Sequence, residues 1–152
     1  MTPLPRAPLA VRPLTADDEA AWRRLWRGYL DFYETTLPEA TYATSFAHLV
    51  DPGVWDYNGL LAERDGVAVG LVHFIFHRHG WIPAGTCYLQ DLFVTADERG
   101  TGTGRALIEA VYAAADAAGR PDVYWLTQAD NHQARALYDR IGRSTPFIKY
   151  RR

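Results

Sequence analysis

The chain has 152 residues, of which 48% are hydrophobic and 13% aromatic, so a disordered chain is excluded and one domain spanning residues 1–152 is predicted. The formal net charge of −2 argues against a nucleic-acid surface, and no apolar run is long enough to predict a membrane-spanning helix. The single Cys87 excludes an internal disulfide and favours a reducing, cytoplasmic location.

The chain begins with a predicted strand and two predicted helices. Residues 9–12 are expected to form the strand, and Thr15 caps a helix whose aromatic stripe continues to Tyr33. In helices of this kind the apolar face normally packs against the core. Pro38 breaks the chain, and residues 39–49 predict a second, weaker helix.

A hairpin is predicted next. Residues 58–64 and 67–77 have strand character, and the Asp65-Gly66 pair between them is a strong signal for a two-residue turn. The second strand is apolar on both alternating sets of residues. We therefore expect helices to cover it on both faces.

Three histidines of this region, His73, His77 and His79, share one parity. A metal site is disfavoured, because a straight strand holds alternate side chains about 7 Å apart and no cysteine or carboxylate cluster joins them. We predict instead that they are core or rim histidines with satisfied hydrogen bonds.

The most informative stretch is residues 88–108. After a predicted turn at residues 80–85, residues 88–94 are rich in β-formers and predict a strand, and helical spacing begins at Ala106. Between strand and helix lies a glycine-rich turn, which presents unpaired backbone N–H groups at the positive end of a helix dipole and therefore predicts a phosphate site. The turn reads Arg99-Gly100-Thr101-Gly102-Thr103-Gly104.

This turn does not match the commonest nucleotide-binding patterns. A P-loop requires Lys and Ser/Thr after its last glycine, and the dinucleotide pattern G-x-G-x-x-G fails because Arg105 or Leu107 occupies its third glycine position. The pattern that fits is Arg-x-x-Gly-x-Gly directly after a strand. A turn of this composition that binds no ligand is the simpler alternative.

The C-terminal part carries a second motif. Residues 121–128 predict a buried strand, and the sequence from Asn131 to Tyr138 has the pattern N-x-x-A-x-x-x-Y. Without a ligand, Asn131 would be a helix N-cap and Tyr138 a core aromatic. The helix is expected to end near Gly142, and residues 145–150 predict a last strand.

These two motifs, in this order and with a strand between them, resemble the signatures of the GNAT superfamily of N-acetyltransferases. The resemblance covers almost the whole chain and implies an α+β fold, with a mixed, mainly antiparallel sheet and helices on both faces. Three segments, YLQDLFV, LTQADNHQARALYDR and PFIKY, are most similar to the polyamine- and histone-type subgroup, which includes spermidine/spermine acetyltransferases.

The resemblance also implies an activity: transfer of an acetyl group from acetyl-CoA (coenzyme A), as cosubstrate and without a metal, directly to a primary amine. The acceptor would be a small amine, a polyamine or a peptide lysine. Tyr138 would protonate the departing thiolate, and a backbone N–H between Leu92 and Val94 would stabilise the oxyanion. The coenzyme-binding residues implied are Leu92, Phe93, Val94, Arg99, Gly100, Thr101, Gly102, Thr103, Gly104, Arg105, Asn131 and Tyr138.

One position departs from the subgroup. Its members read Y-L-E-D, with the glutamate proposed as the base, whereas this chain reads Tyr88-Leu89-Gln90-Asp91. A glutamine cannot accept the proton of the amine, and Asp91 points to the opposite face of an ideal strand. Gln90, Asp91 and Tyr138 are the catalytic candidates. The base stays open between Asp91 at a bulge, a histidine on the neighbouring strand, and a water chain, unless the acceptor is not a polyamine.

Two functions of different classes follow. The first is an active N-acetyltransferase, which the presence of Tyr138 favours. The second is a weakly active or inactive module that binds acetyl-CoA as a sensor or interaction partner. By analogy, the aromatic C-terminal strand implies a homodimer.

Overall fold

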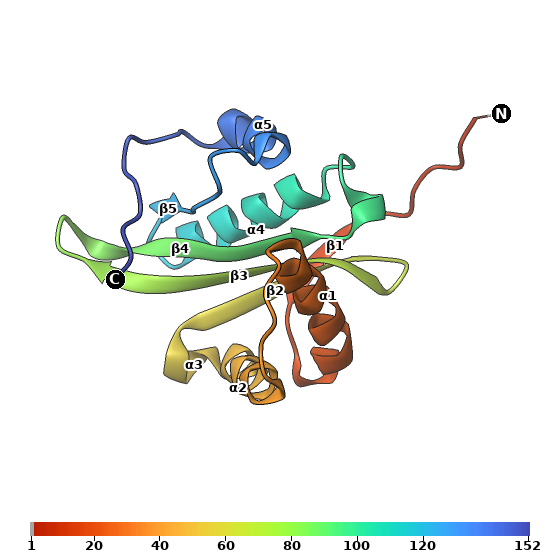
Figure 1. Ribbon diagram of the computed structural model, residues 1–152, viewed down its shortest axis with the longest axis horizontal. Coiled ribbons are helices and arrows are strands. Elements are labelled where there is room, and N and C mark those ends of the chain that lie inside the picture. Colours follow the sequence, from red (N-terminus) through yellow and green to blue (C-terminus); the bar gives the residue numbers. More distant parts are fainter. Residues whose placement is uncertain (1) are drawn as a thin grey trace.

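The fold is built on a five-stranded sheet, seen in a computed structural model that describes residues 2–152 apart from the side chains of residues 54 and 55 (Figure 1). The strands lie in the order of the chain, and each pair is antiparallel except the last, which is parallel. The predicted mixed, mainly antiparallel sheet is thereby confirmed. The strands are β1 (Ala10–Pro13), β2 (Tyr57–Arg64), β3 (Val67–His79), β4 (Ile82–Val94) and β5 (Val123–Tyr124).

Helices cover both faces of the sheet, as expected (Figure 1). One face carries α1 (Glu19–Phe32), α2 (Glu39–Val50) and the short α3 (Pro52–Trp55), which was not predicted. The other carries α4 (Thr103–Ala117) and α5 (His132–Ile141). Single 3₁₀ turns at Ala16–Asp18 and Ala96–Glu98 precede α1 and α4. Within the described part of the chain, none of the helices combines the length and apolar character needed to cross a membrane.

The two helical layers create two hydrophobic cores. The core under α1 and α2 is built from residues at helical spacing on α1, and the core under α4 from the equivalent stripe of that helix. Strand β3 is buried from Ala68 to Phe74 because it contributes to both cores, as its continuous apolar pattern predicted. The largest members are Trp22, Leu25, Trp26, Phe46 and Leu71 in the first core and Leu107, Ile108, Val111, Phe74 and Leu89 in the second.

The turns at the two ends of β3 differ in how well they were predicted. Asp65 and Gly66 both have positive φ angles, of 50° and 73°, which is the conformation of the predicted two-residue turn. The turn expected over residues 80–85 is wrong in length. Strand β3 continues to His79, which pairs with Ile82, so only two residues form the turn.

Strand β4 contains a β-bulge in the middle of its motif. His73 of β3 pairs with Asp91, and the next residue, Phe74, pairs with Leu89, which leaves Gln90 without a partner on β3. A bulge of this kind adds one residue and reverses the alternation of side chains that follow it. Leu89 therefore packs in the core under α4, whereas Asp91 lies on the α1 side beside His73.

The buried strand predicted at residues 121–128 is mostly wrong. Only Val123 and Tyr124 pair with β4, opposite Cys87 and Tyr88, and the residues around them are partly or fully exposed. The pairing between β4 and β5 ends just before the bulge, because a bulge increases the local twist and turns β4 away from β5.

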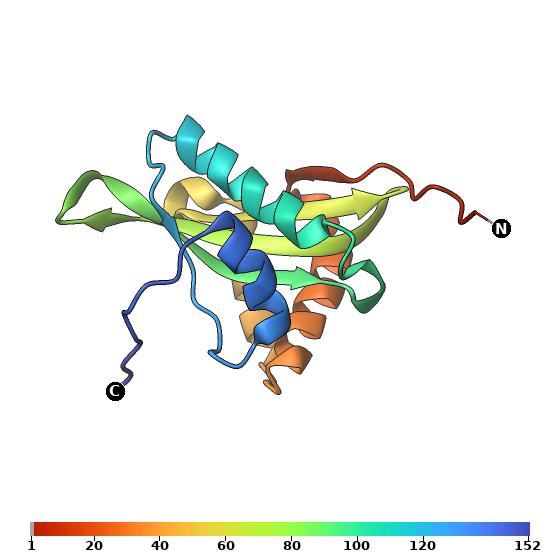
Figure 2. The same cartoon turned by 90° about the horizontal axis from the view of Figure 1, so that it is seen from above.

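The last strand predicted at residues 145–150 is also wrong. These residues have no β structure, and Phe147 and Tyr150 are 82% and 87% exposed. Figure 2 shows the chain after α5 as an irregular segment that runs away from the sheet. A strand needs a partner edge, and within residues 2–152 the two-residue β5 offers no further one.

Candidate active site

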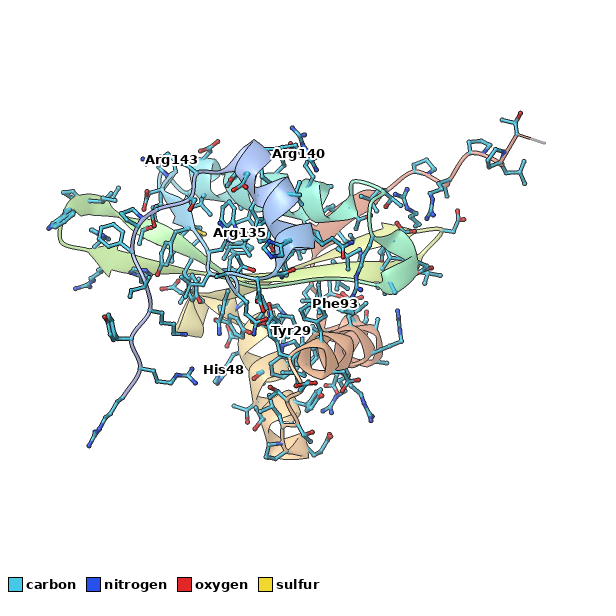
Figure 3. All side chains as sticks on the ribbon, turned by 45° about the horizontal axis from the view of Figure 1, so that its top comes forward. Tyr29, His48, Phe93, Arg135, Arg140 and Arg143 are labelled. Carbon is cyan, nitrogen blue, oxygen red and sulfur yellow. The ribbon has the colours of Figure 1, made fainter. Side chains whose placement is uncertain are left out.

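A cleft of about 330 Å³ lies between the end of α1, strand β4 and helix α5. The aromatic side chains of Tyr29, Phe32 and Tyr33 line it from the α1 side, and Figure 3 shows Tyr29 beside Phe93 of β4. The turn before α4 and the inner side of α5 complete the wall. The volume of the cleft falls in the usual range for small-molecule sites, about 300–1,000 Å³.

The glycine-rich turn forms one end of this cleft. Gly100 and Gly102 have φ angles of +77° and +91°, which side chains with a Cβ rarely adopt, and no atom lies within 4 Å of a Cβ built on either. Gly102 is followed directly by α4, whose first backbone N–H groups lack partners within the helix. The turn therefore has the open space and the donors that a phosphate group requires.

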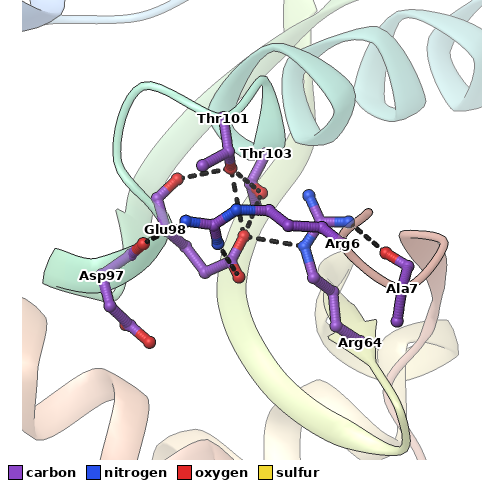
Figure 4. Close-up of polar contacts among 7 residues, drawn as sticks. All are labelled: Arg6, Ala7, Arg64, Asp97, Glu98, Thr101 and Thr103. Atoms are coloured by element: carbon purple, nitrogen blue, oxygen red, sulfur yellow. Dashed lines mark hydrogen bonds and ion pairs between the residues drawn. The ribbon is translucent and has the colours of Figure 1, made fainter. Parts of the chain in front are cut away.

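A buried glutamate, Glu98, holds this turn from below (Figure 4). Its Oε2 accepts hydrogen bonds from Arg64 Nε at 2.9 Å, Thr101 Oγ1 at 3.0 Å and Thr103 Oγ1 at 3.1 Å, and its Oε1 accepts one from Arg6 Nη1 at 3.0 Å. The hydrogen bond from Arg64 holds the pKa of this carboxyl below its ordinary value. Both threonine hydroxyls thus serve the shape of the turn, and neither threonine lines the cleft.

The sequence pattern did not reveal Glu98 as part of the site. The only local signal is an acidic residue before an R-x-x-G turn. This signal does not distinguish a buried carboxylate with several hydrogen-bond partners from an exposed one. The partner residues Arg6 and Arg64 are 92 and 34 positions away in the chain.

We expect Glu98→Ala to lower the free energy of unfolding by about 3 kcal/mol, because the partly buried Arg64 would lose its carboxylate partner. Urea unfolding at pH 7 measures this. The matched control is Glu109→Ala, whose ion pair with Arg105 is exposed and contributes about 0–1 kcal/mol. Equal losses in both variants would contradict a structural role for Glu98.

The same residue predicts a pH dependence. A carboxyl whose pKa is lowered by folding stabilises the fold fully above its unfolded value of 4.5, and this stabilisation is lost as the pH falls through the lower folded value. The difference in the free energy of unfolding between the native protein and Glu98→Ala should therefore begin to shrink below about pH 4.5 and decrease further as the pH falls.

Arginine side chains give the cleft a basic character. Arg99 and Arg105 line it beside the turn, and Arg140 lines it from α5 (Figure 3). The Arg99 guanidinium lies over the rings of Phe32 and Phe93, at 5.8 and 6.0 Å from their centroids. These three cations suit a ligand that carries several phosphate charges.

The edge of β4 along the cleft is open. Leu92, Phe93 and Val94 line the cleft, and the pairing of β4 with β5 has already ended at Tyr88. In the described part of the chain no strand follows on this edge, so backbone N–H and C=O groups of the segment are available to a ligand.

Helix α5 brings Asn131 and Tyr138 to the opposite wall. Asn131 occupies the N-cap position, yet its side chain makes no capping hydrogen bond and donates to Thr127 Oγ1 at 3.3 Å. The Tyr138 ring packs edge-on against Trp125, and burial, followed by the neighbouring Tyr33, raises the pKa of Tyr138 to about 12. Its hydroxyl therefore keeps its proton at neutral pH.

The two candidates at the bulge have different surroundings. Gln90 is exposed and does not line the cleft, whereas Asp91 is 6% exposed. Asp91 Oδ2 lies 2.8 Å from His73 Nδ1. Burial, and then the negative charge and hydrogen bonding of Asp91, raise the pKa of both Tyr29 and Tyr57. Because Tyr29 also lines the cleft, the Asp91 carboxylate stands one side chain behind its wall.

The three histidines have separate hydrogen-bond partners, as predicted. His73 is fully buried with both ring nitrogens in hydrogen bonds, and His77 Nε2 lies 2.8 Å from the hydroxyl of Tyr124. His79 Nδ1 accepts the backbone N–H of Trp81. Among residues 2–152, no group of three or more His, Cys, Asp or Glu side chains is arranged to hold a metal ion.

Comparison with known proteins finds relatives over nearly the whole chain. The family model described as "Acetyltransferase (GNAT) family" matches residues 20–142. The D-amino-acid N-acetyltransferase of Saccharomyces cerevisiae is 37% identical over 145 residues, which are 95% of this chain and 90% of that protein. These relatives give no support to the narrower resemblance to the polyamine- and histone-type subgroup.

Solved structures share the fold. The ribosomal-protein-alanine N-acetyltransferase from Brucella melitensis biovar Abortus 2308 has a TM-score of 0.78 at 22% identity, with 94% of this chain and 96% of that chain covered. AAC(6')-Iy in complex with the bisubstrate analogue CoA-S-monomethyl-acetylneamine has a TM-score of 0.82 at 19% identity, with 96% and 99% covered. At these identities the likeness concerns the fold alone.

Proposed function

Because the chain belongs to the GNAT family of acetyltransferases and is an acetyl-transferring enzyme, we propose that it transfers acetyl groups to the amino group of a small molecule. Family membership implies acetyl-CoA as the acetyl donor. The observation that carries the proposal is that one cleft is lined by the glycine-rich start of α4, by three arginines and by Tyr138.

The residues of the cleft fit the parts of acetyl-CoA. The backbone N–H groups of Gly100 and of residues 102–105, with the guanidinium of Arg99, would hold the pyrophosphate. The side chain of Asn131 and the open edge of β4 would hold the pantetheine arm by hydrogen bonds. The open space at Gly100 and Gly102 supports this fit, since a Cβ there would intrude on a phosphate.

Acetyl-CoA supplies an activated acyl group, and the protein supplies positioning and proton transfer. As the C–N bond forms and the C–S bond breaks, the Tyr138 hydroxyl gives its proton to the thiolate sulfur. Backbone N–H groups of residues 92–94 stabilise the carbonyl oxygen. The proton lost by the amine passes to a base on the α1 side of β4, for which we propose Asp91, directly or through one water.

For the acceptor we propose the α-amino group of a free amino acid, and the D-configured class first. The yeast relative carries this activity in its name, and it aligns over 95% of this chain. The aromatic side chains of Tyr29, Phe32 and Tyr33 on the α1 side of the cleft favour an acceptor with an apolar side chain.

Release of CoA, followed with a thiol reagent, tests the proposal on four acceptors: D-phenylalanine, L-phenylalanine, spermidine and a lysine-containing peptide. We expect the highest kcat/KM for D-phenylalanine. Tight acetyl-CoA binding by calorimetry, with no transfer to any of the four, would support the alternative of a sensor or interaction module and overturn the proposal.

The position of Gln90 leads to a second expectation. Since Gln90 is exposed and outside the cleft, Gln90→Glu should change kcat/KM for spermidine and D-phenylalanine by less than about threefold, as for most surface substitutions. Steady-state kinetics on both acceptors measure this. An increase of about tenfold or more for spermidine would instead assign the vacant base position to residue 90.

A further inference from the structure

A glycine interrupts the interior of helix α1. Gly28 occupies a position at which glycine is less favourable than alanine by about 1 kcal/mol, and such a glycine usually has a packing or functional reason. The reason here is Phe93 of β4. A Cβ built on Gly28 would lie 2.6 Å from Cζ and 2.8 Å from Cε1 of the Phe93 ring. The missing side chain therefore leaves a notch in α1, and the ring of Phe93 fills it.

The same ring supports a cation of the cleft. The Arg99 guanidinium lies over the rings of Phe93 and Phe32, with its Cζ 6.0 and 5.8 Å from their centroids. Phe32 follows Gly28 by four positions on α1, so the notch and the second ring lie on one face of that helix. We call the rings of Phe32 and Phe93 the aromatic platform.

Arg99 differs from its neighbour in the cleft in having no acidic partner. Arg105 pairs with Glu109, whereas in the described part of the chain no carboxylate lies at ion-pair distance from Arg99. A carboxylate would orient the guanidinium but would compete with a phosphate for its N–H groups. An aromatic ring orients it without this competition, because a guanidinium stacks through its plane and donates hydrogen bonds from its edge.

We propose that Gly28, Phe32 and Phe93 are positioning residues for Arg99. The notch at Gly28 lets the Phe93 ring lie against α1, and the aromatic platform then presents the edge of the guanidinium to the phosphates of the coenzyme. A side chain that is oriented before the ligand arrives loses less conformational freedom on binding, which raises affinity. This rests on the proposed function only in that the phosphates of acetyl-CoA reach Arg99.

Two ligands separate the phosphate contact from the rest of the coenzyme site. S-acetylpantetheine has the thioester and the pantetheine arm of acetyl-CoA but no phosphate. Arg99→Ala should weaken binding of acetyl-CoA by about tenfold or more, as expected for a lost charge-assisted contact, and change that of S-acetylpantetheine by less than about twofold. Calorimetry measures the first affinity and an NMR titration the second. Native affinity of Arg99→Ala for acetyl-CoA would overturn the proposal.

The aromatic platform is tested at Phe32, which is 52% exposed and can be replaced with little cost in packing. Phe32→Leu should weaken acetyl-CoA binding by about threefold, the size of an exposed cation–π contact, and leave S-acetylpantetheine binding unchanged. In protein that already carries Arg99→Ala, Phe32→Leu should have no further effect, because the ring acts only through Arg99. Additive losses of acetyl-CoA affinity, or equal losses for both ligands, would overturn the proposal.

The notch is tested with matched substitutions in two helices. Gly28→Ala displaces the Phe93 ring, whereas Gly53→Ala in α3 meets no described atom within 4 Å. We expect Gly28→Ala to weaken acetyl-CoA binding by about threefold or more, with no further effect in the Arg99→Ala background, and Gly53→Ala to bind with native affinity. Native affinity in folded Gly28→Ala would overturn the role of the glycine. If thermal unfolding shows that Gly28→Ala is unfolded at the titration temperature, the cycle with Phe32→Leu decides.

The same measurements keep this proposal apart from the proposed function. Non-additive effects of Phe32→Leu and Arg99→Ala on acetyl-CoA binding, in a protein that acetylates no acceptor, would retain the aromatic platform and reject the proposed function. Acetylation of an amino acid together with additive effects would retain the proposed function and reject the platform.

Discussion

Replacing Tyr138 by phenylalanine is expected to lower kcat for acetyl transfer by about 10²–10⁴-fold, the usual contribution of a positioned proton donor where proton transfer limits the rate. The ring of Tyr138 packs on Trp125 and would do so without its hydroxyl. The raised pKa, about 12, means that the hydroxyl is protonated at neutral pH, so its loss removes a donor and not a charge. The affinity for acetyl-CoA should change by less than about twofold.

The matched control for this variant is Tyr112→Phe. Tyr112 of α4 also lies beside Trp125, and its hydroxyl donates to the carbonyl of Ile141 at 2.8 Å, outside the cleft. Both variants should bind acetyl-CoA in calorimetry, and Tyr112→Phe should keep the native kcat. An unchanged kcat in Tyr138→Phe, with the best acceptor, would make Tyr138 a core aromatic and leave the thiolate to depart unassisted.

The second large effect is expected at the glycine-rich turn. Gly102→Val should weaken acetyl-CoA binding by about tenfold or more, because a branched side chain disfavours the φ of +91° that brings the backbone to the ligand. Gly104→Val should have a similar effect for a different reason. Its φ is helical, but its Cβ would point between Leu137 and Val94, at 3.5 and 3.9 Å, across the cleft.

Gly66→Val is the control for the strain alone. Gly66 has a φ of +73° with no atom within 4 Å of its Cβ position, as at Gly102, but it lies in the β2–β3 hairpin. Thermal unfolding should show similar destabilisation of Gly66→Val and Gly102→Val, and calorimetry should show weaker acetyl-CoA binding only in the second. Native affinity in folded Gly102→Val and Gly104→Val would exclude the turn as the phosphate site.

The predictions from sequence succeeded where the signal is local. Helical spacing on α1, the continuous apolar run of β3 and the Asp65-Gly66 turn each contain the information for their own structure. The strands predicted at residues 121–128 and 145–150 failed because strand structure also depends on a neighbouring edge. β-propensity alone does not provide that edge.

The residues of the site also divide into those that local sequence patterns predicted and those that they did not. The residues of the two motifs could be named from their spacing, and most of them line the cleft, but Thr101 and Thr103 turn away to Glu98. The pairing of Asp91 with His73 depends on a bulge, which the sequence left open as one of several possibilities. Contacts of this kind join residues far apart in sequence, so the spacing of residues along one segment does not contain them.

The bulge at Gln90 also has a consequence for how this chain tolerates changes in length. The residues of β4 beyond position 90 alternate between the two faces of the sheet independently of that one extra residue: Phe93 reaches the α1 layer, and Leu92 and Val94 reach the α4 layer. Substitutions of an exposed residue leave this arrangement intact. Deletion of the same residue would remove the bulge and join Leu89 to Asp91 in regular alternation, so that Asp91 and Phe93 would still face α1 and Leu92 would still face α4. In a scan of single-residue deletions, position 90 should therefore be among the best tolerated within β4, whereas deletion of a paired neighbour such as Leu92 would move the residues beyond it to the opposite faces.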